Sequence, residues 1–267
     1  MSNSEAVSEN KQSPVSHRRI GNGPPVLLIH GFGEDRRVWD GVVNELEKEY
    51  SLIIPDLPGT GLSPLVPDMS IEGMAEALVP ILPEGPIAVI GHSMGGYIAL
   101  ALLGKYPDKL NSLALFHSTS YADSDEKKQA RLKSIEFIKQ HGAFEFLKTS
   151  IPNLFSALSK QKMAGAINDF IDQQAGSEAS SLIAYYEAMM NRPDRRSLLK
   201  NSRIPLLFLL GKYDVAVPFS DGLAQCHLPA ISYIHILRRS GHMGMMEEAE
   251  SANKALKNYL FQVHSIQ

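Results

Sequence analysis

The ten residues IAVIGHSMGG, from Ile87 to Gly96, constrain the fold of this chain most strongly. They join a run of β-branched apolar residues to a Gly-x-Ser-x-Gly turn centred on Ser93, and a helix-like stretch follows directly. Such a turn lifts one hydroxyl above the end of a strand, the position that a serine nucleophile requires. Gly91 and Gly95 fit this turn because a side chain at either position would collide with the neighbouring strand or helix. Ser93 is therefore the first candidate for chemistry.

Strand-like and helix-like stretches alternate along most of the chain. Strands are expected at residues 26–30, 52–55, 87–91, 112–116, 205–211 and 231–236, and helices at 35–48, 70–82 and 94–105, with a last helix near the end. Strands that alternate with helices in this way predict right-handed crossovers and a mainly parallel sheet flanked by helices. The fold class is therefore α/β.

The middle of the chain interrupts this alternation. Residues 121–199 hold no convincing strand. A charged helix is expected to open at Asp123-Ser-Asp-Glu126, followed by helices at 143–149, 154–174 and 177–191. We therefore divide the chain into a disordered tail (1–12), the first part of an α/β core (13–120), a helical insertion (121–199) and the second part of the core (200–267).

Three further loops supply the acid, the base and the oxyanion hole that a nucleophilic serine needs. A strand that breaks at Gly211 delivers Asp214 at its end, and a glycine-flanked loop after the next strand carries His242. Asp214 is the expected acid and His242 the expected base. The His-Gly-Phe-Gly loop after the first of the predicted strands lets the backbone come close to Ser93. The N–H groups of Phe32 and Met94 are then the expected oxyanion hole.

The chain order Ser93, Asp214, His242, the His-Gly-Phe-Gly loop and the Gly-His-Ser-Met-Gly-Gly loop together resemble the α/β-hydrolase fold, in particular its small esterase and lipase-like members. The resemblance implies that the insertion forms a cap over the nucleophile. It also implies that Asp56, in Asp-Leu-Pro-Gly-Thr-Gly-Leu-Ser63, has a structural role.

Other candidates for the site fit less well. Asp123 follows a strand at a place where some members of this family carry the acid, but it lies too far behind the strand end. His30 is interpreted as structural, and His92 as a packing residue that points away from the site. Arg36 and Arg37 are interpreted as part of a solvated face, although an anionic substrate end could also contact them.

The substrate pocket is expected to be largely apolar, with walls from both the insertion and the core. Its candidate residues are His117, Phe144, Tyr185, Met189, Val215 and Met243. Flexible and aromatic side chains of this kind favour an apolar acyl or alcohol group.

These observations predict a serine hydrolase that acts on a small, largely apolar carboxylic ester, thioester or lactone through an acyl-enzyme. Hydrolysis of a carbon–carbon bond, a lyase reaction with the same triad, and a ligand receptor without enzymatic activity remain open, because a fold does not fix a reaction.

Composition excludes several other functions. Hydrophobic residues make up 44% of the 267 residues, and a net charge of −3 gives no reason to invoke nucleic acid or an anionic membrane as a partner. The single cysteine, Cys226, cannot form an internal disulfide, and no cofactor or metal motif is visible. With no signal peptide and no membrane-spanning stretch, we expect a cytoplasmic protein with a small-molecule, ester-type substrate. The oligomeric state stays open.

Overall fold

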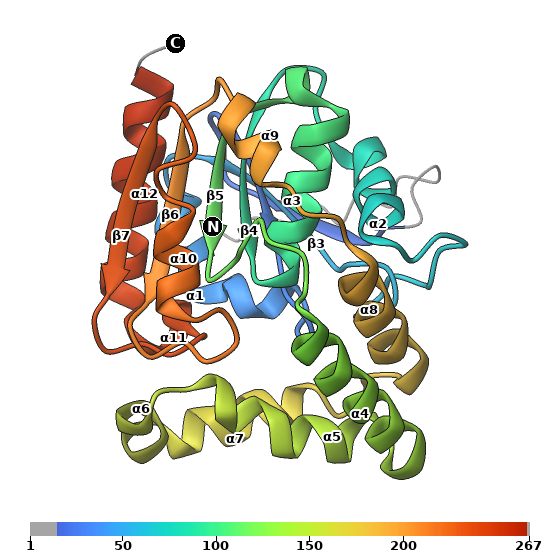
Figure 1. The fold of residues 1–267 in the computed structure, drawn as a ribbon. Coiled ribbons are helices and arrows are strands. Elements are labelled where there is room, and N and C mark those ends of the chain that lie inside the picture. The colour runs from blue at the N-terminus through green and yellow to red at the C-terminus, as the bar shows by residue number, and fades with distance from the viewer. Residues whose placement is uncertain (1–14, 266–267) are drawn as a thin grey trace, which may run out of the picture.

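A seven-stranded sheet forms the centre of the molecule in a computed structural model that describes residues 15–265. The predicted disordered tail, residues 1–12, lies outside the described residues. The strand order is β1-β3-β2-β4-β5-β6-β7; β1 pairs antiparallel with β3, and all other pairs are parallel (Figure 1). The predicted α/β fold with a mainly parallel sheet is confirmed. The strands are β1 (His17–Ile20), β2 (Pro25–Ile29), β3 (Ser51–Pro55), β4 (Ile87–His92), β5 (Leu110–Phe116), β6 (Leu206–Gly211) and β7 (Ser232–Leu237).

The sequence predicted six of these strands but missed β1. β1 has only four residues, His-Arg-Arg-Ile, and it lies at the edge of the sheet, where the hydrophobic pattern is weakest. The inner strands β4 and β6 are buried along their whole length, as expected for parallel strands covered on both faces.

Helices cover both faces of the sheet. α1 (Asp40–Leu46) packs with α12 (Ala249–Ser265) on one face, and α2 (Ile71–Leu78) with α3 (Met94–Lys105) on the other (Figure 1). Shorter elements complete the core: α10 (Phe219–Ala224), α11 (Gly244–Glu247) and the 3₁₀ turns η1 (Arg36–Trp39), η2 (Val79–Ile81) and η3 (Pro107–Lys109).

Two predicted helices are shorter in the structure. The helix expected at 35–48 begins as η1, where the Asp35 side chain accepts a hydrogen bond from Arg37 N, and only then continues as α1. The helix expected at 70–82 ends at Leu78, because Pro80 has no N–H to donate to the preceding turn.

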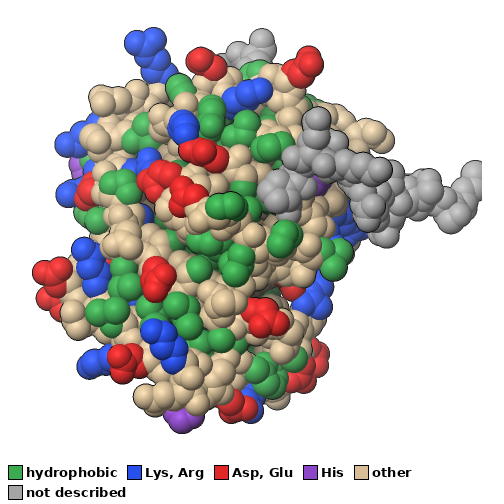
Figure 2. All heavy atoms as spheres, turned by 90° about the vertical axis from the view of Figure 1, so that its right-hand side faces the viewer, with side chains coloured by type: hydrophobic (Ala, Val, Ile, Leu, Met, Phe, Trp, Pro, Cys, Tyr) green, Lys and Arg blue, Asp and Glu red, His purple; other side chains and the backbone are tan. Residues whose placement is uncertain are grey.

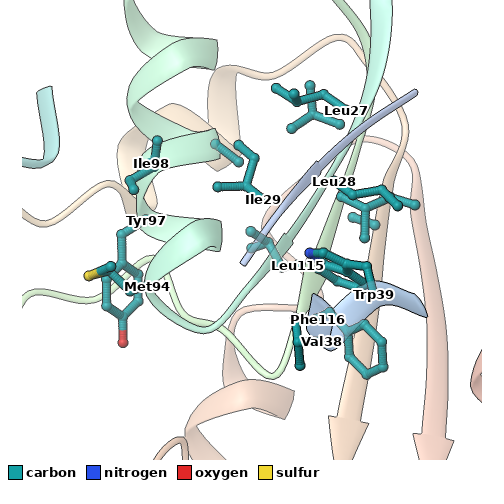
Figure 3. Close-up of a cluster of buried hydrophobic side chains, with 14 of the residues drawn as sticks. Leu27, Leu28, Ile29, Val38, Trp39, Met94, Tyr97, Ile98, Leu115 and Phe116 are labelled. Atoms are coloured by element: carbon teal, nitrogen blue, oxygen red, sulfur yellow. The ribbon is translucent and has the colours of Figure 1, made fainter. Parts of the chain in front are cut away.

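The core under the site is made by residues on both faces of β2. Ile29 faces Ile98 of α3, whereas Leu28 points to the opposite face, toward Trp39 (Figure 3). Trp39 is fully buried, with its ring 6.1 Å from that of Phe116. This packing fixes the end of β5 relative to the loop that follows β2.

The regular elements in the segment between β5 and β6 are all helices, joined by short loops and turns. It contains α4 (Asp125–His141), α5 (Ala143–Ser150), η4 (Ile151–Leu154), α6 (Ala157–Lys162), α7 (Ala164–Gln173), α8 (Ala179–Asn191) and α9 (Arg196–Asn201). Helices α4 to α8 lie beyond the carboxyl ends of the parallel strands (Figure 1). The expected helix 154–174 is instead two helices, because Met163 leaves the helical region at φ −120°. The expected end of the insertion, residue 199, falls inside α9, which lies toward the opposite end of the sheet.

The outer surface is mixed in character. On the face that carries α2 and α8, small groups of apolar side chains alternate with acidic and basic ones (Figure 2). Among residues 15–265, none of the helices has the length and apolar character needed to cross a membrane.

Candidate active site

Ser93 lies in a strained turn between β4 and α3. Its φ of 50° and ψ of −117° are rare for a residue with a side chain. The turn is held from both sides: Ser93 N donates to Phe116 O at 2.9 Å, and Ser118 Oγ donates to Ser93 O at 2.8 Å. A side chain at Gly91 would come within 2.5 Å of Gly95 O, and one at Gly95 would overlap the carbonyls of Ile29 and His30. The geometry therefore needs both glycines.

The structure brings Asp214 and His242 together at the carboxyl edge of the sheet. His242 Nδ1 lies 2.8 Å from Asp214 Oδ2, and both side chains are buried. A carboxylate accepts, so Nδ1 carries the proton, and the lone pair of the neutral ring is left on Nε2. His242 and Ser93 line the same cavity. Among the described residues no direct hydrogen bond joins them; such contacts commonly shorten when substrate binds.

Asp214 is held in its ionised form by four neighbours. Its Oδ1 accepts the N–H groups of Ala216 and Val217, each at 2.9 Å, and Oδ2 faces His117 Nδ1 at 3.2 Å as well as His242. Burial alone would raise the pKa of Asp214, but the attraction to His242 and the contacts with both histidines hold it well below its usual range.

His117 is a second, neutral histidine on this carboxylate. It is fully buried at a φ of 49°, and its Nε2 accepts the Gly244 N–H at 3.2 Å, so its own proton lies on Nδ1, facing Asp214. Burial lowers the pKa of His117, despite the opposing effect of Asp214.

Two backbone N–H groups point to an oxyanion hole. Neither Phe32 N nor Met94 N has a hydrogen-bond acceptor within residues 15–265. Met94 is the first residue of α3, where the helix dipole adds positive potential. The Phe32 ring stacks on Tyr186, with centroids 4.3 Å apart, which links this loop to α8.

A buried ion pair between Glu34 and His92 connects the oxyanion loop, the His-Gly-Phe-Gly segment at residues 30–33, to His242. His92 Nδ1 lies 3.0 Å from the Glu34 carboxylate, and His92 Nε2 donates to His242 O at 3.0 Å. Glu34 also accepts the Gly31 N–H at 2.7 Å. Burial opposes the charge on both side chains, but their mutual attraction raises the pKa of His92 and lowers that of Glu34. The interpretation of His92 as a mere packing residue is therefore wrong.

The cavity at Ser93 is small, about 140 Å³. It lies between the core and the insertion, and it is lined by Phe32, Glu34, Ser93, Tyr97, Arg131, Leu154, Tyr186, Met189, Ala216, Val217 and His242. Sites for drug-sized ligands measure about 300–1,000 Å³, so only a small group fits here.

A larger cavity of about 380 Å³ lies between the loops at 33–37 and 59–65 and the connection from α7 to α8. It contains neither Ser93 nor His242, and its walls are mostly polar. We therefore place the chemistry in the smaller cavity.

Of the six residues predicted to line the pocket, only Met189 does so. Val215 is 68% exposed, because the bonds from Ala216 N and Val217 N to Asp214 turn those two residues inward and Val215 outward. Tyr185 and Met243 are buried in the core, and the Tyr185 hydroxyl donates to Pro58 O at 2.6 Å.

The other two predicted pocket residues also lie elsewhere. Phe144 packs at the edge of the core under Lys148, whose Nζ lies 5.2 Å from the ring centroid. His117 sits behind Asp214 rather than on the cavity wall.

The less favoured candidates have structural partners. His30 Nε2 accepts the Leu57 N–H at 2.9 Å, as expected for a structural histidine. Asp123 is fully buried between Arg131 and Arg192. Arg37 is exposed, as expected for a solvated face, and its guanidinium forms a bidentate pair with the buried carboxylate of Asp35. Burial raises the pKa of the Cys226 thiol to about 11, consistent with an unreactive cysteine.

His117, Asp214 and His242 are the one group of candidate metal ligands found in the described part of the chain, with donor atoms within 4.8 Å of one another. The Gly244 N–H occupies the second nitrogen of His117, and two backbone N–H groups occupy Asp214 Oδ1. We therefore assign these groups to hydrogen bonding around the carboxylate.

Sequence reasoning missed Glu34, Arg131 and Tyr186. Glu34 directly follows the oxyanion-loop glycines, a position that could have marked it as a neighbour of the site. Arg131 and Tyr186 lie on α4 and α8, and no local pattern distinguishes their orientation from that of other residues on these helices.

Known proteins share both the sequence pattern and the fold. Residues 24–249 match the family model of the alpha/beta hydrolase fold. The pimeloyl-acyl-carrier-protein methyl ester esterase of Aeromonas hydrophila is 31% identical over 210 residues, which cover 76% of this chain and 82% of that protein. The corresponding esterase of Chromobacterium violaceum is 29% identical over 254 residues, which cover 90% of this chain and 96% of that protein.

A thermophilic esterase from Thermogutta terrifontis, solved with malate bound, superimposes with a TM-score of 0.88 at 30% identity and 94% coverage of both chains. The enol-lactonase of Burkholderia xenovorans, at 21% identity, shows the same fold with a TM-score of 0.84. The chain therefore belongs to the alpha/beta hydrolase fold family and is an enzyme of the carboxylesterase type.

Proposed function

We propose that this protein hydrolyses a small carboxylic ester through an acyl-enzyme on Ser93, with His242 as the base and Asp214 as the acid. The observation that carries the proposal is the meeting of three features at one cavity: the strained Ser93 turn, the His242–Asp214 pair, and two backbone N–H groups without acceptors. The substrate we propose is a small molecule rather than nucleic acid or a membrane lipid surface.

The first half of the reaction forms the acyl-enzyme. Ser93 Oγ attacks the ester carbonyl carbon while His242 Nε2 takes the hydroxyl proton. The carbonyl oxygen becomes an oxyanion, and the N–H groups of Phe32 and Met94 bind it. His242 then gives its proton to the departing alkoxide, which leaves as the alcohol. Asp214 stabilises the imidazolium throughout.

The second half uses water. His242 takes a proton from a water molecule that attacks the acyl carbon, and the proton then passes to Ser93 Oγ as the C–O bond to the enzyme breaks. The products are a carboxylic acid and free enzyme. Because the cavity measures about 140 Å³, we propose a short acyl or alkyl group at the reacting centre.

The names of the relatives suggest a methyl ester as the reacting group. Both curated relatives described above are methyl ester esterases. Methanol is the smallest alcohol that an ester can release, and this suits the small cavity. We therefore place methyl esters of short acyl chains first among the candidate substrates.

The test is hydrolysis of p-nitrophenyl esters of increasing acyl length, and of the matching methyl esters, by the wild type and by Ser93→Ala. The proposal predicts turnover that is highest for short acyl groups and that falls by at least about 10⁴-fold in Ser93→Ala. Turnover that persists in the variant would contradict the assignment of the nucleophile. A wild type inactive on every ester would favour carbon–carbon bond hydrolysis, lyase chemistry or ligand reception.

A further inference from the structure

Arg131 lines the cavity of the proposed active site, and one hydrogen-bonding edge of its guanidinium has no partner among the described residues. Its Nε and Nη2 bind the two oxygens of Asp123, at 2.5 and 3.3 Å. This side-on pairing occupies one edge of the planar guanidinium and leaves the edge formed by Nη1 and Nη2. Within the described residues, Nη1 of Arg131 has no hydrogen-bond partner. The side chain lines the same cavity as Ser93 and His242.

The charges of Arg131 and its ion-pair partners do not cancel. The Asp123 carboxylate is fully buried and faces two guanidinium groups, those of Arg131 and Arg192, whose side chains are 18% and 4% exposed. Arg192 lies 2.7 Å from the carboxylate, so Asp123 keeps a full partner even without Arg131. The two guanidinium groups and the one carboxylate therefore carry a net charge of +1.

The other charged groups at the cavity do not neutralise this positive charge. Glu34 is paired with His92, and the Asp214 charge lies behind His242, satisfied by two histidines and two backbone N–H groups. Lys127 adds a further cation near the rim, where its Nζ donates to Ala216 O at 3.3 Å.

We propose that Arg131 forms an anion subsite and that the substrates of this enzyme include half-esters of short dicarboxylic acids, bound with the free carboxylate on Arg131 and the ester at Ser93. This inference rests on the proposed function for the position of the ester. A carboxylate matches the open edge because its two oxygens accept two parallel N–H bonds. The remaining walls, including Phe32, Leu154 and Met189, suit the short methylene chain between the two ends.

The test compares two methyl esters of nearly equal size: monomethyl succinate, which carries a carboxylate, and methyl succinamate, which carries a neutral amide in its place. We expect the wild type to favour the first by about 10- to 100-fold in kcat/KM. In Arg131→Met this ratio should fall to near one, and in Arg131→Lys it should take an intermediate value, because an ammonium keeps the charge but not the paired N–H edge.

Lys133→Met is the matched control. It removes the same charge from the same helix at an exposed position, so the ratio should stay at its wild-type value. Circular dichroism checks that Arg131→Met is folded. Equal rates on the two esters in the wild type would overturn the proposal whether or not the variant folds, and so would a preference for the half-ester that survives in folded Arg131→Met.

Calorimetric binding of succinate separates this inference from the proposed reaction. Wild type and Ser93→Ala should bind succinate at least about 10-fold more tightly than succinamide, and Arg131→Met should lose this difference. This pattern would support the subsite even if Ser93→Ala kept its esterase activity. Equal binding of the two compounds by the wild type would contradict the subsite even if Ser93 proved to be the nucleophile.

Discussion

The two walls of the cavity are built in different ways. On the core side, backbone hydrogen bonds fix Ser93 at the end of β4 and Asp214 just beyond β6, two parallel strands that flank β5. His242 is held by the hydrogen bond that His92 donates to the His242 carbonyl. On the insertion side, Tyr186 and Met189 of α8 are held by packing, such as the stacking of Tyr186 on Phe32. Backbone bonds allow little change of geometry, whereas side-chain packing tolerates substitution. The core wall therefore suits the chemistry, and the insertion wall suits the choice of substrate.

The largest effect is expected on the core side. In Asp214→Asn, the amide can no longer hold the productive tautomer of His242 or stabilise its charged form, so kcat should fall by about 10⁴-fold. Steady-state kinetics on the best ester would measure this loss. A variant that keeps a tenth or more of the wild-type kcat would show that the chemistry does not depend on this pair.

The Glu34–His92 pair should affect stability more than any residue of the insertion wall. Glu34→Gln leaves the buried His92 without its counter-charge, and we expect a loss of about 3–5 kcal/mol in the free energy of unfolding. Urea denaturation at pH 7 measures this loss, with exposed Glu136→Gln as the control. The double variant Glu34→Gln/His92→Asn should recover part of the stability; no recovery would argue against the pair.

Substitutions in the insertion wall should change the selectivity for acyl length. Met189→Ala enlarges the small cavity, so the ratio of kcat/KM for hexanoyl over acetyl p-nitrophenyl ester should rise by about 10-fold. Val215→Ala, at a residue that is 68% exposed, should change the same ratio by less than about twofold. Equal shifts in the two variants would mean that the cavity wall has been assigned to the wrong residues.

The smallest effect concerns pH. Because the pKa of buried His117 lies below its ordinary value of 6.5, the unfolded chain takes up a proton at this residue before the folded chain does as the pH falls. His117 therefore lowers the free energy of unfolding below pH 6.5, by up to about 1.4 kcal/mol per pH unit. Between pH 6.5 and 5, His117→Asn should lose stability less steeply than the wild type. Parallel curves in chemical denaturation would contradict this.

How well the sequence predicts the site also differs between the core wall and the insertion wall. Ser93, Asp214 and His242 could be placed together because each follows a strand, and the carboxyl ends of parallel strands meet at one edge of the sheet. Arg131 and Tyr186 could not be found, because their orientation depends on how α4 packs against α8, and no local spacing encodes that contact. Val215 was misplaced because the hydrogen bonds of Asp214 decide which residue of the turn faces inward.

The most direct test of the account is covalent labelling of the protein with a fluorophosphonate, followed by mass spectrometry of its peptides. We predict one adduct per chain, on Ser93, and a strongly reduced rate of labelling in His242→Ala, because the base that activates the hydroxyl is then missing. Ester turnover with an unlabelled Ser93, or an adduct on another residue, would contradict the account.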